Sequence, residues 1–318
     1  MNRATLALIL FTAVPCALAQ SYPQRSIRLV VPSSPGGGTD ITGRIVAHKL
    51  TEQLGQQVVV DNRAGAGTTI GNDIVAKSPP DGYTLLMGLS TLAINPSMYA
   101  KLPYDALRDF APVSLVVLSP NILTVHPSVP ARTVKQFIAL AKGKPGSITF
   151  GSAGHGTSPH LSGELLKVLA KIDIVHVPYK GSGQSVIGLL AGEIGANFPS
   201  VPTAMPYLKT NRLHGLGVTT AKRTQALPEV PSIAEAGVSG YEATQWFGVL
   251  APAGTPRPII DRLQQEIVKL LRSPDVRERL IADGTDPVGN TPEEFAAYIR
   301  SETEKWAKVI KAAGIKAQ

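Results

Sequence analysis

The sequence predicts an α/β protein of two lobes, each built around a mostly parallel sheet. Short apolar runs typical of buried strands alternate with amphipathic segments typical of helices. This alternation favours parallel sheets that helices cover on both faces. The strands outnumber what one sheet comfortably holds, and no internal repeat or low-complexity tract interrupts the pattern. We therefore expect two sheets and a chain that crosses between them.

The first residues are typical of a signal peptide rather than of the folded protein. Arg3 precedes an apolar run from Ala4 to Val14, and Ala17-Leu18-Ala19 matches the small-x-small pattern of a cleavage site. The run is shorter than the ~20 residues that span a bilayer. We predict a signal peptide over residues 1–19, a mature chain from about Gln20 and a periplasmic location. An uncleaved anchor is the alternative.

Apolar periodicity defines the elements of the mature chain. Strands are predicted over residues 26–31, 57–60, 84–87, 113–117, 122–125, 148–150, 174–177, 215–219 and 248–251. Helices are predicted over residues 41–54, 133–141, 160–170, 185–190, 202–208, 233–236, 258–271 and 292–313. Crossings near residues 118–124 and 240–248 divide the chain into lobe I (20–120 and 243–318) and lobe II (121–242).

Composition restricts the possible partners. The formal charge is +8, but Lys and Arg are spread along the chain with few aromatic residues beside them. This distribution favours a solvated basic surface over a nucleic-acid site, and a mildly positive body still attracts anions. Cys16 is the only cysteine, so an exported mature chain would have no disulfide and would be stabilised by burial alone. We expect a monomer that needs no cofactor.

A glycine-rich turn joins the first strand to the first helix. Three successive glycines, Gly36 to Gly38, let the backbone turn sharply and let a ligand approach without obstruction by Cβ atoms. Free N–H groups at the start of the helix can hold a carboxylate. An ordinary turn, with Thr39 or Asp40 capping the helix, is the alternative.

A matching turn lies in the middle of the chain, between residues 150 and 160. It also joins a strand to a helix, and it carries small residues, hydroxyls and free amides suited to an anion. Capping by Thr157 or Ser158 is the alternative. The two turns would lie in different lobes, and across a cleft they would enclose a polar-lined pocket.

Catalytic and metal motifs are incomplete. Gly156-Thr157-Ser158-Pro159-His160 resembles a nucleophile elbow, but His160 replaces the last glycine. His155 and His160 lack a neighbouring cysteine or paired carboxylate, which favours hydrogen bonding or ligand lining over metal ligation. The sequence therefore predicts recognition rather than catalysis, with a secreted hydrolase as the weakest alternative.

Ordered motifs along nearly the whole mature chain resemble one family. They include Pro35-Gly36-Gly37-Gly38-Thr39-Asp40, Val59-Val60-Asp61-Asn62-Arg63, Pro80-Asp81-Gly82-Tyr83-Thr84, Gly151-Ser152-Ala153-Gly154, His176-Val177-Pro178-Tyr179 and Trp246-Phe247-Gly248. Together they resemble the Bug (Bordetella uptake gene) family, the extracytoplasmic solute receptors of tripartite tricarboxylate transporters.

The resemblance implies a type II periplasmic-binding-protein fold with a central ligand cleft between its lobes. It also implies a small carboxylate ligand and membrane subunits of a tripartite transporter as partners. A periplasmic sensor for a two-component system, on the same scaffold, is the alternative. The residues expected to bind the ligand are Ser34, Gly36, Gly37, Gly38, Thr39, Asp40, Ser90, Thr91, Ser152, Gly154, His155, Gly156, Thr157, Ser158 and Ser200.

One departure from the family pattern bears on the ligand. Pro199-Ser200 stands where members of the family commonly show Asp-Asn. An acidic residue there could meet the ammonium group of an amino acid. Its absence favours an aliphatic or aromatic mono- or dicarboxylate without an amino group.

Overall fold

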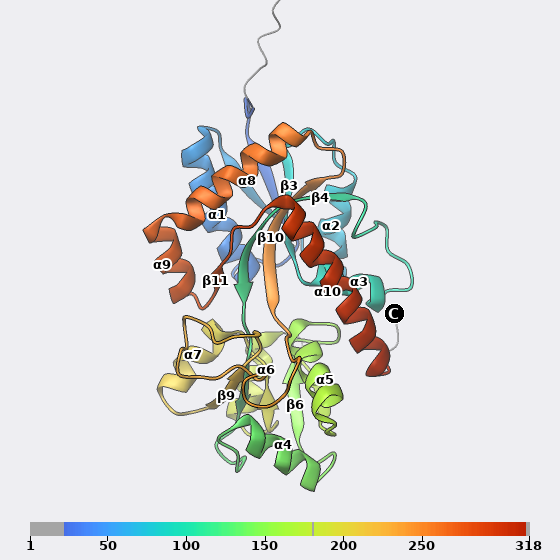
Figure 1. The fold of residues 1–318 in the computed structure, drawn as a ribbon, viewed down its shortest axis with the longest axis vertical. Coiled ribbons are helices and arrows are strands. Elements are labelled where there is room, and N and C mark those ends of the chain that lie inside the picture. Colours follow the sequence, from blue (N-terminus) through green and yellow to red (C-terminus); the bar gives the residue numbers. More distant parts are fainter. Residues whose placement is uncertain (1–21, 180, 316–318) are drawn as a thin grey trace, which may run out of the picture.

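The computed structural model describes residues 22–179 and 181–315, which form two α/β lobes joined by two chain crossings (Figure 1). The predicted signal peptide and the mature start at Gln20 lie outside these residues. No helix within the described ranges is long and apolar enough to cross a membrane.

Lobe I is built on a six-stranded sheet of order β11-β4-β10-β3-β1-β2. Its strands are β1 (Ile27–Val31), β2 (Val58–Asn62), β3 (Thr84–Leu89), β4 (Phe110–Ser119), β10 (Gln245–Pro252) and β11 (Asp286–Pro287). Its helices are α1 (Gly38–Leu54), the short 3-10 helix η1 (Ala66–Thr68), α2 (Thr69–Ala76), α3 (Thr91–Met98), α8 (Arg257–Arg272), α9 (Pro274–Ala282) and α10 (Pro292–Ala312). Residues of α1, α8 and α9 share one apolar cluster with the sheet, while residues of α2, α3 and α10 share a second.

Lobe II contains a five-stranded sheet of order β7-β6-β8-β5-β9. Its strands are β5 (Ile122–Val125), β6 (Thr149–Ser152), β7 (Val175–Pro178), β8 (Ala196–Asn197) and β9 (His214–Val218). Its helices are α4 (Val134–Gly143), α5 (Ser158–Ala170), α6 (Ser182–Leu190) and α7 (Val201–Lys209). The two-lobed α/β prediction is confirmed.

Both sheets are mixed, which corrects the expectation of mostly parallel sheets. In lobe I, β1 pairs in parallel with β2 and β3, whereas β10 runs antiparallel to both of its neighbours. In lobe II, β6 pairs in parallel with β7 and β8, whereas β5 runs antiparallel to β8 and β9. The physical reason is the crossing itself: β5 and β10 each enter a sheet directly from the other lobe, so each runs against the strands beside it.

Several elements differ from their predicted form. Residues 233–236, predicted as a helix, form a turn that Gly237 ends at φ 111°, a conformation that favours glycine. Helices α2, α3 and α9 were not predicted, since α2 and α9 are short and α3 contains Pro96.

The last helix, α10, contacts both lobes (Figure 1). Phe295 and Ile299 in its first half join an apolar cluster of lobe I. Trp306, Val309 and Ile310 in its second half join the cluster that contains the core of lobe II together with Ile94 and Met98 of α3. The strands of lobe I come from residues 27–119 and 245–287 and those of lobe II from 122–218. Lobe boundaries at 120/121 and 242/243 remain a prediction, and the end of α10 packs outside the lobe to which it was assigned.

Candidate functional site

A cavity of about 640 Å³ lies between the two lobes, and both lobes and both crossings contribute to its walls. Lobe I contributes the turn before α1, the starts of η1 and α3, and residues from β10 and the end of α9. Lobe II contributes the turn before α5 and the starts of α6 and α7. Asn121 and Gln245 come from the two crossings. This arrangement makes it the candidate ligand site.

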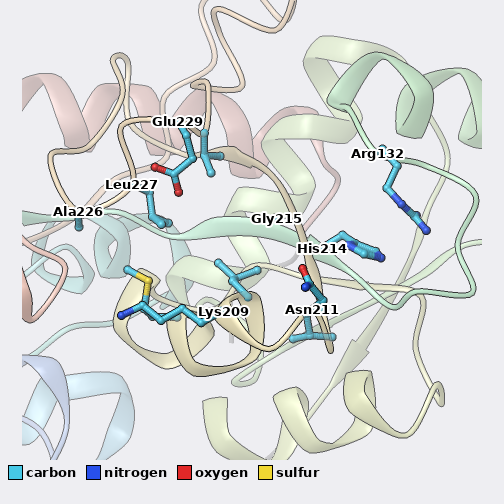
Figure 2. A pocket seen from close by; sticks show the side chains of 12 residues that line it. Arg132, Lys209, Asn211, His214, Gly215, Ala226, Leu227 and Glu229 are labelled. Atoms are coloured by element: carbon cyan, nitrogen blue, oxygen red, sulfur yellow. The ribbon is translucent and has the colours of Figure 1, made fainter.

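A second pocket, of about 430 Å³, belongs to lobe II alone (Figure 2). Arg132, Lys209, His214 and Glu229 stand around an apolar floor that includes Leu227. Because lobe I contributes nothing to it, a ligand bound there would not favour one arrangement of the lobes over another.

The first glycine turn lies in the wall of the inter-lobe cavity. The buried strand β1 ends at Val31, and α1 begins at Gly38 with Gly37 as an extended N-cap residue. No side chain caps this helix, so the alternative, capping by Thr39 or Asp40, is not found. The first N–H groups of α1 are therefore open to a ligand.

Asp40 holds this turn in place and does not line the cavity. Its carboxylate is buried and accepts hydrogen bonds from the N–H of Gly36 (2.9 Å), Nε of Arg44 (3.0 Å) and Nδ2 of Asn62 (2.9 Å). Burial raises the pKa of the Asp40 carboxyl, but these hydrogen bonds outweigh it and hold the pKa below its usual value. Ser34 is exposed and lies outside the cavity wall, whereas Ser33 is part of it.

The second turn, before α5, contributes Thr157 and Ser158 to the opposite wall. Thr157 is the N-cap residue of α5, but its hydroxyl donates to the carbonyl of Gly154 (2.7 Å), and no side chain caps the helix. Ser158 accepts a hydrogen bond from Nδ2 of Asn121 (2.8 Å), which ties the turn to the first crossing.

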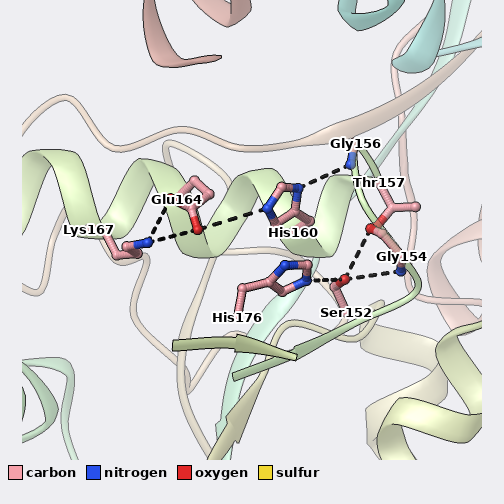
Figure 3. Close-up of polar contacts among 8 residues, drawn as sticks. All are labelled: Ser152, Gly154, Gly156, Thr157, His160, Glu164, Lys167 and His176. Carbon is pink, nitrogen blue, oxygen red and sulfur yellow. Dashed lines mark hydrogen bonds and ion pairs between the residues drawn. The ribbon is translucent and has the colours of Figure 1, made fainter. Parts of the chain in front are cut away.

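Four other expected residues of this turn lie behind the cavity wall. Ser152 is fully buried; its Oγ accepts from the N–H of Gly154 (3.0 Å) and lies 2.6 Å from Nε2 of His176 (Figure 3). The N–H of Gly156 donates to Nδ1 of His160 (3.0 Å). These contacts fix the shape of the turn, and Ser152, Gly154, His155 and Gly156 are not among the residues that line the cavity.

Hydroxyl groups at three further helix starts complete the polar lining. Ser90 precedes α3, and its buried Oγ has no hydrogen-bond partner among the described residues. Thr91 Oγ1 lies 2.7 Å from the hydroxyl of Thr68. Ser200 is the N-cap residue of α7, and its Oγ lies 2.8 Å from Oγ1 of Thr203. Ser182 and Gly183, at the start of α6, were not expected.

Five helices, α1, α3, α5, α6 and α7, thus begin at one cavity, and none has a side-chain cap. Each helix start carries a partial positive charge and free N–H groups. No lysine, arginine or histidine lines the cavity within the described ranges. The groups that the described residues offer to an anion there are N–H and hydroxyl groups.

The structure brings together nine of the expected residues. They are Gly36, Gly37, Gly38, Thr39, Ser90, Thr91, Thr157, Ser158 and Ser200. Sequence reasoning missed Asn121 and Gln245, although both fall within the predicted crossings and could have been found there. It also missed three apolar residues of the cavity wall, Ile41, Leu89 and Phe247, which belong to no motif. A further residue that it missed is Asp283, which brings a carboxylate to the lining.

This chain has two α/β lobes, and both line the cavity between them. This architecture is that of the two-lobed binding proteins. Residues 42–315 match the model of the tripartite tricarboxylate transporter family receptor, and the chain belongs to that family. The resemblance found in the sequence is confirmed.

Individual relatives agree with this assignment. The chain is 44% identical over 291 residues (91% of this chain, 87% of the relative) to a protein of the tcbD–tcbE intergenic region of Pseudomonas sp. (strain P51). It is 39% identical over 300 residues (94% and 92%) to protein BugT of Bordetella pertussis (strain Tohama I). A solved structure described as R. palustris Rpa4515 with adipate superposes with a TM-score of 0.83 at 37% identity, covering 94% of this chain and all of that one.

Proposed function

We propose that this protein is the extracytoplasmic receptor that captures a small carboxylate for a tripartite tricarboxylate transporter. The observation that carries the proposal is the convergence of five uncapped helix starts, from both lobes, on one cavity that no basic side chain of the described residues lines. Such groups stabilise negative charge through N–H hydrogen bonds and helix dipoles.

The cavity also limits what the ligand can be. Its volume of about 640 Å³ is that of a small-molecule site, and Ile41, Leu89 and Phe247 provide apolar wall. These walls suit the carbon chain or ring of a mono- or dicarboxylate. Adipate, which the similar R. palustris protein holds, is a ligand of this kind.

Binding would be coupled to the arrangement of the lobes. A ligand that touches the α1 turn of lobe I and the α5 turn of lobe II favours the closed arrangement, because only that arrangement offers both sets of contacts. The closed monomer would then dock on the membrane subunits, on the outer side of the membrane that the signal peptide implies.

A thermal-shift and calorimetric titration with adipate tests the proposal. A ligand that binds only the folded state raises the melting temperature. We expect adipate to raise it and the uncharged diamide of adipate to leave it unchanged. A panel of other mono- and dicarboxylates identifies the best ligand, and no response to any member of the panel would contradict the proposal.

Variants of the two turns locate the site. Gly37→Leu should abolish the shift, because a side chain at this N-cap position would stand among the N–H groups of α1. Gly143→Leu is the matched control, since a Cβ at Gly143, as at Gly37, would meet no close contact and the φ is ordinary, but Gly143 lies outside the cavity. Replacing Thr157 and Ser158 together by Ala should abolish the shift as well. An unchanged shift in both turn variants would locate binding elsewhere.

The same titration tests the expectation about amino acids. That expectation rests on the absence of an acidic residue at position 199, but Asp283 supplies a carboxylate to the cavity from the end of α9. If glutamate or aspartate binds more tightly than plain dicarboxylates, Asp283→Asn should remove that preference.

A further inference from the structure

Three histidine side chains gather behind the turn before α5. His155 comes from the turn, His160 from the first turn of α5 and His176 from β7. One ring nitrogen of each lies within 4.8 Å of the others. The ring centroids of His160 and His176 are 4.0 Å apart, and that of His155 lies 5.0 Å from His176 and 5.3 Å from His160. None of the three lines the inter-lobe cavity, so carboxylate capture leaves this cluster unexplained.

The hydrogen bonds around the cluster define which nitrogens are unprotonated (Figure 3). Nδ1 of His160 accepts the N–H of Gly156 at 3.0 Å, so its proton sits on Nε2, which lies 3.9 Å from a carboxylate oxygen of Glu164. The hydroxyl of Ser152 lies 2.6 Å from Nε2 of His176 and 3.0 Å from the carbonyl of Gly154. The lone pair of His160 is therefore on Nδ1.

The surroundings keep both rings neutral. Burial, followed by the neighbouring histidines and Lys167, lowers the pKa of His160 to about 3. Burial, with His155 and Lys167, lowers the pKa of His176 to about 4. Both rings are therefore neutral in the metal-free protein.

The neighbouring groups match those that support metal-ligating histidines. Such histidines usually donate their second ring N–H to a carboxylate or another acceptor, which fixes the orientation of the ring. Glu164 lies on that side of His160, with a carboxylate oxygen 3.9 Å from Nε2, and the hydroxyl of Ser152 lies 2.6 Å from Nε2 of His176. Lys167 pairs with Glu164 at 2.9 Å and so holds the carboxylate in place. His155 is exposed, which gives an ion a path from solvent.

We propose that His155, His160 and His176 bind one divalent first-row transition-metal ion, with Zn²⁺ as the representative ion. His160 offers Nδ1, His155 and His176 each offer one ring nitrogen, and a water molecule completes a tetrahedral shell. Binding releases the Gly156 N–H from His160, so the ion fixes the turn from behind while the ligand contacts it from the front. Sequence spacing could not indicate this site, because the third histidine, His176, lies on a separate element, β7.

Calorimetric titration of the metal-free protein, purified without a polyhistidine tag, with ZnCl₂ tests the proposal. We expect one ion per chain. Co²⁺ should give the visible absorption of tetrahedral coordination, which a loosely bound surface ion does not give. His155→Ala and His176→Ala should each weaken binding by about tenfold or more, since each removes a ligand. His48→Ala, which removes an exposed histidine of α1 beside Glu52, is the matched control and should bind as the wild type does.

The outcome does not depend on the ligand of the cavity, because no variant alters a lining residue. His155 is exposed, so its replacement should leave the fold intact, and circular dichroism checks this for every variant. The absence of measurable Zn²⁺ binding by the wild type would overturn the proposal. Wild-type affinity in the His155→Ala/His176→Ala double variant would overturn it equally.

Discussion

Replacing Asp40 by Asn should destabilise the turn that forms one wall of the cavity. Asn has nearly the same shape, so the change removes charge and one acceptor without creating a cavity. In the wild type, Oδ2 of Asp40 accepts from Gly36 N–H and Arg44, while Oδ1 accepts from Nδ2 of Asn62. If the oxygen of the introduced amide replaces Oδ2, the NH₂ group of that amide faces the NH₂ group of Asn62.

The magnitude follows from this substitution of a donor for an acceptor. A buried hydrogen bond is lost and two donors face each other, which costs about 1–3 kcal/mol. The ion pair with Arg44 contributes little beyond this, because the Arg44 side chain is 55% exposed. We expect the free energy of unfolding to fall by about 2 kcal/mol.

Urea denaturation at pH 7 measures the change, and an exchange of partners tests the reasoning. In the Asp40→Asn/Asn62→Asp double variant, the carboxylate now at position 62 can accept from the amide now at position 40. It can also accept from Arg44, whose Nη2 already lies 3.2 Å from Oδ1 of Asn62 in the wild type. Part of the lost stability should return.

Asp81→Asn is a surface control, because Asp81 and its partner Arg25 are 43% and 66% exposed. A change below ~0.5 kcal/mol in Asp40→Asn would refute the argument.

The effect should also depend on pH. The folded pKa of Asp40 is lowered, so its contribution is present above the unfolded pKa of about 4 and is lost as pH falls through the folded value. The difference in unfolding free energy between wild type and Asp40→Asn should therefore narrow below about pH 4. A difference that stays constant down to acid unfolding would show that Asp40 is not ionised in the folded protein.

Three further substitutions test packing and capping by the same urea assay. Gly163→Ala should cost about 1–3 kcal/mol, because a Cβ there would overlap the ring of Phe150, and a neutral result would show that this ring can move. Trp306→Ala should cost about 3–5 kcal/mol, since the buried indole of α10 belongs to an apolar cluster with residues of both lobes; a cost below ~1 kcal/mol would mean that the packing of this indole contributes little to stability. Thr291→Ala removes the reciprocal cap with Glu294 at the start of α10 and should cost about 1 kcal/mol, whereas Ser at this position should retain the cap.

The fold class could be predicted because periodicity is local. Each buried strand and amphipathic helix leaves its own apolar pattern, so β1, α1, α5 and α8 were found within a few residues of their bounds. Short elements such as α9 leave too few turns for a pattern, and the direction of β5 and β10 depends on which lobe the chain comes from. Local sequence carries no information on that direction.

The site was predicted in part for the same reason. A glycine-rich turn before a helix is visible in sequence, so the turns before α1 and α5 were identified together with several residues of the cavity wall. The sequence could not tell which side of each turn faces the cavity. Only the contacts show that Asp40 and Ser152 bond to Asn62 and His176 behind the turns, whereas Ser33 and Ala153 line the cavity.

By itself, the sequence determined the α/β class, the family and two of the turns that meet a ligand, because these follow from residue types at short spacing. Only the tertiary structure brought five helix starts to one cavity and placed His176 beside His155 and His160. Those groups lie on elements far apart in the chain, and their distances are set by how the sheets pair and pack rather than by spacing along the sequence.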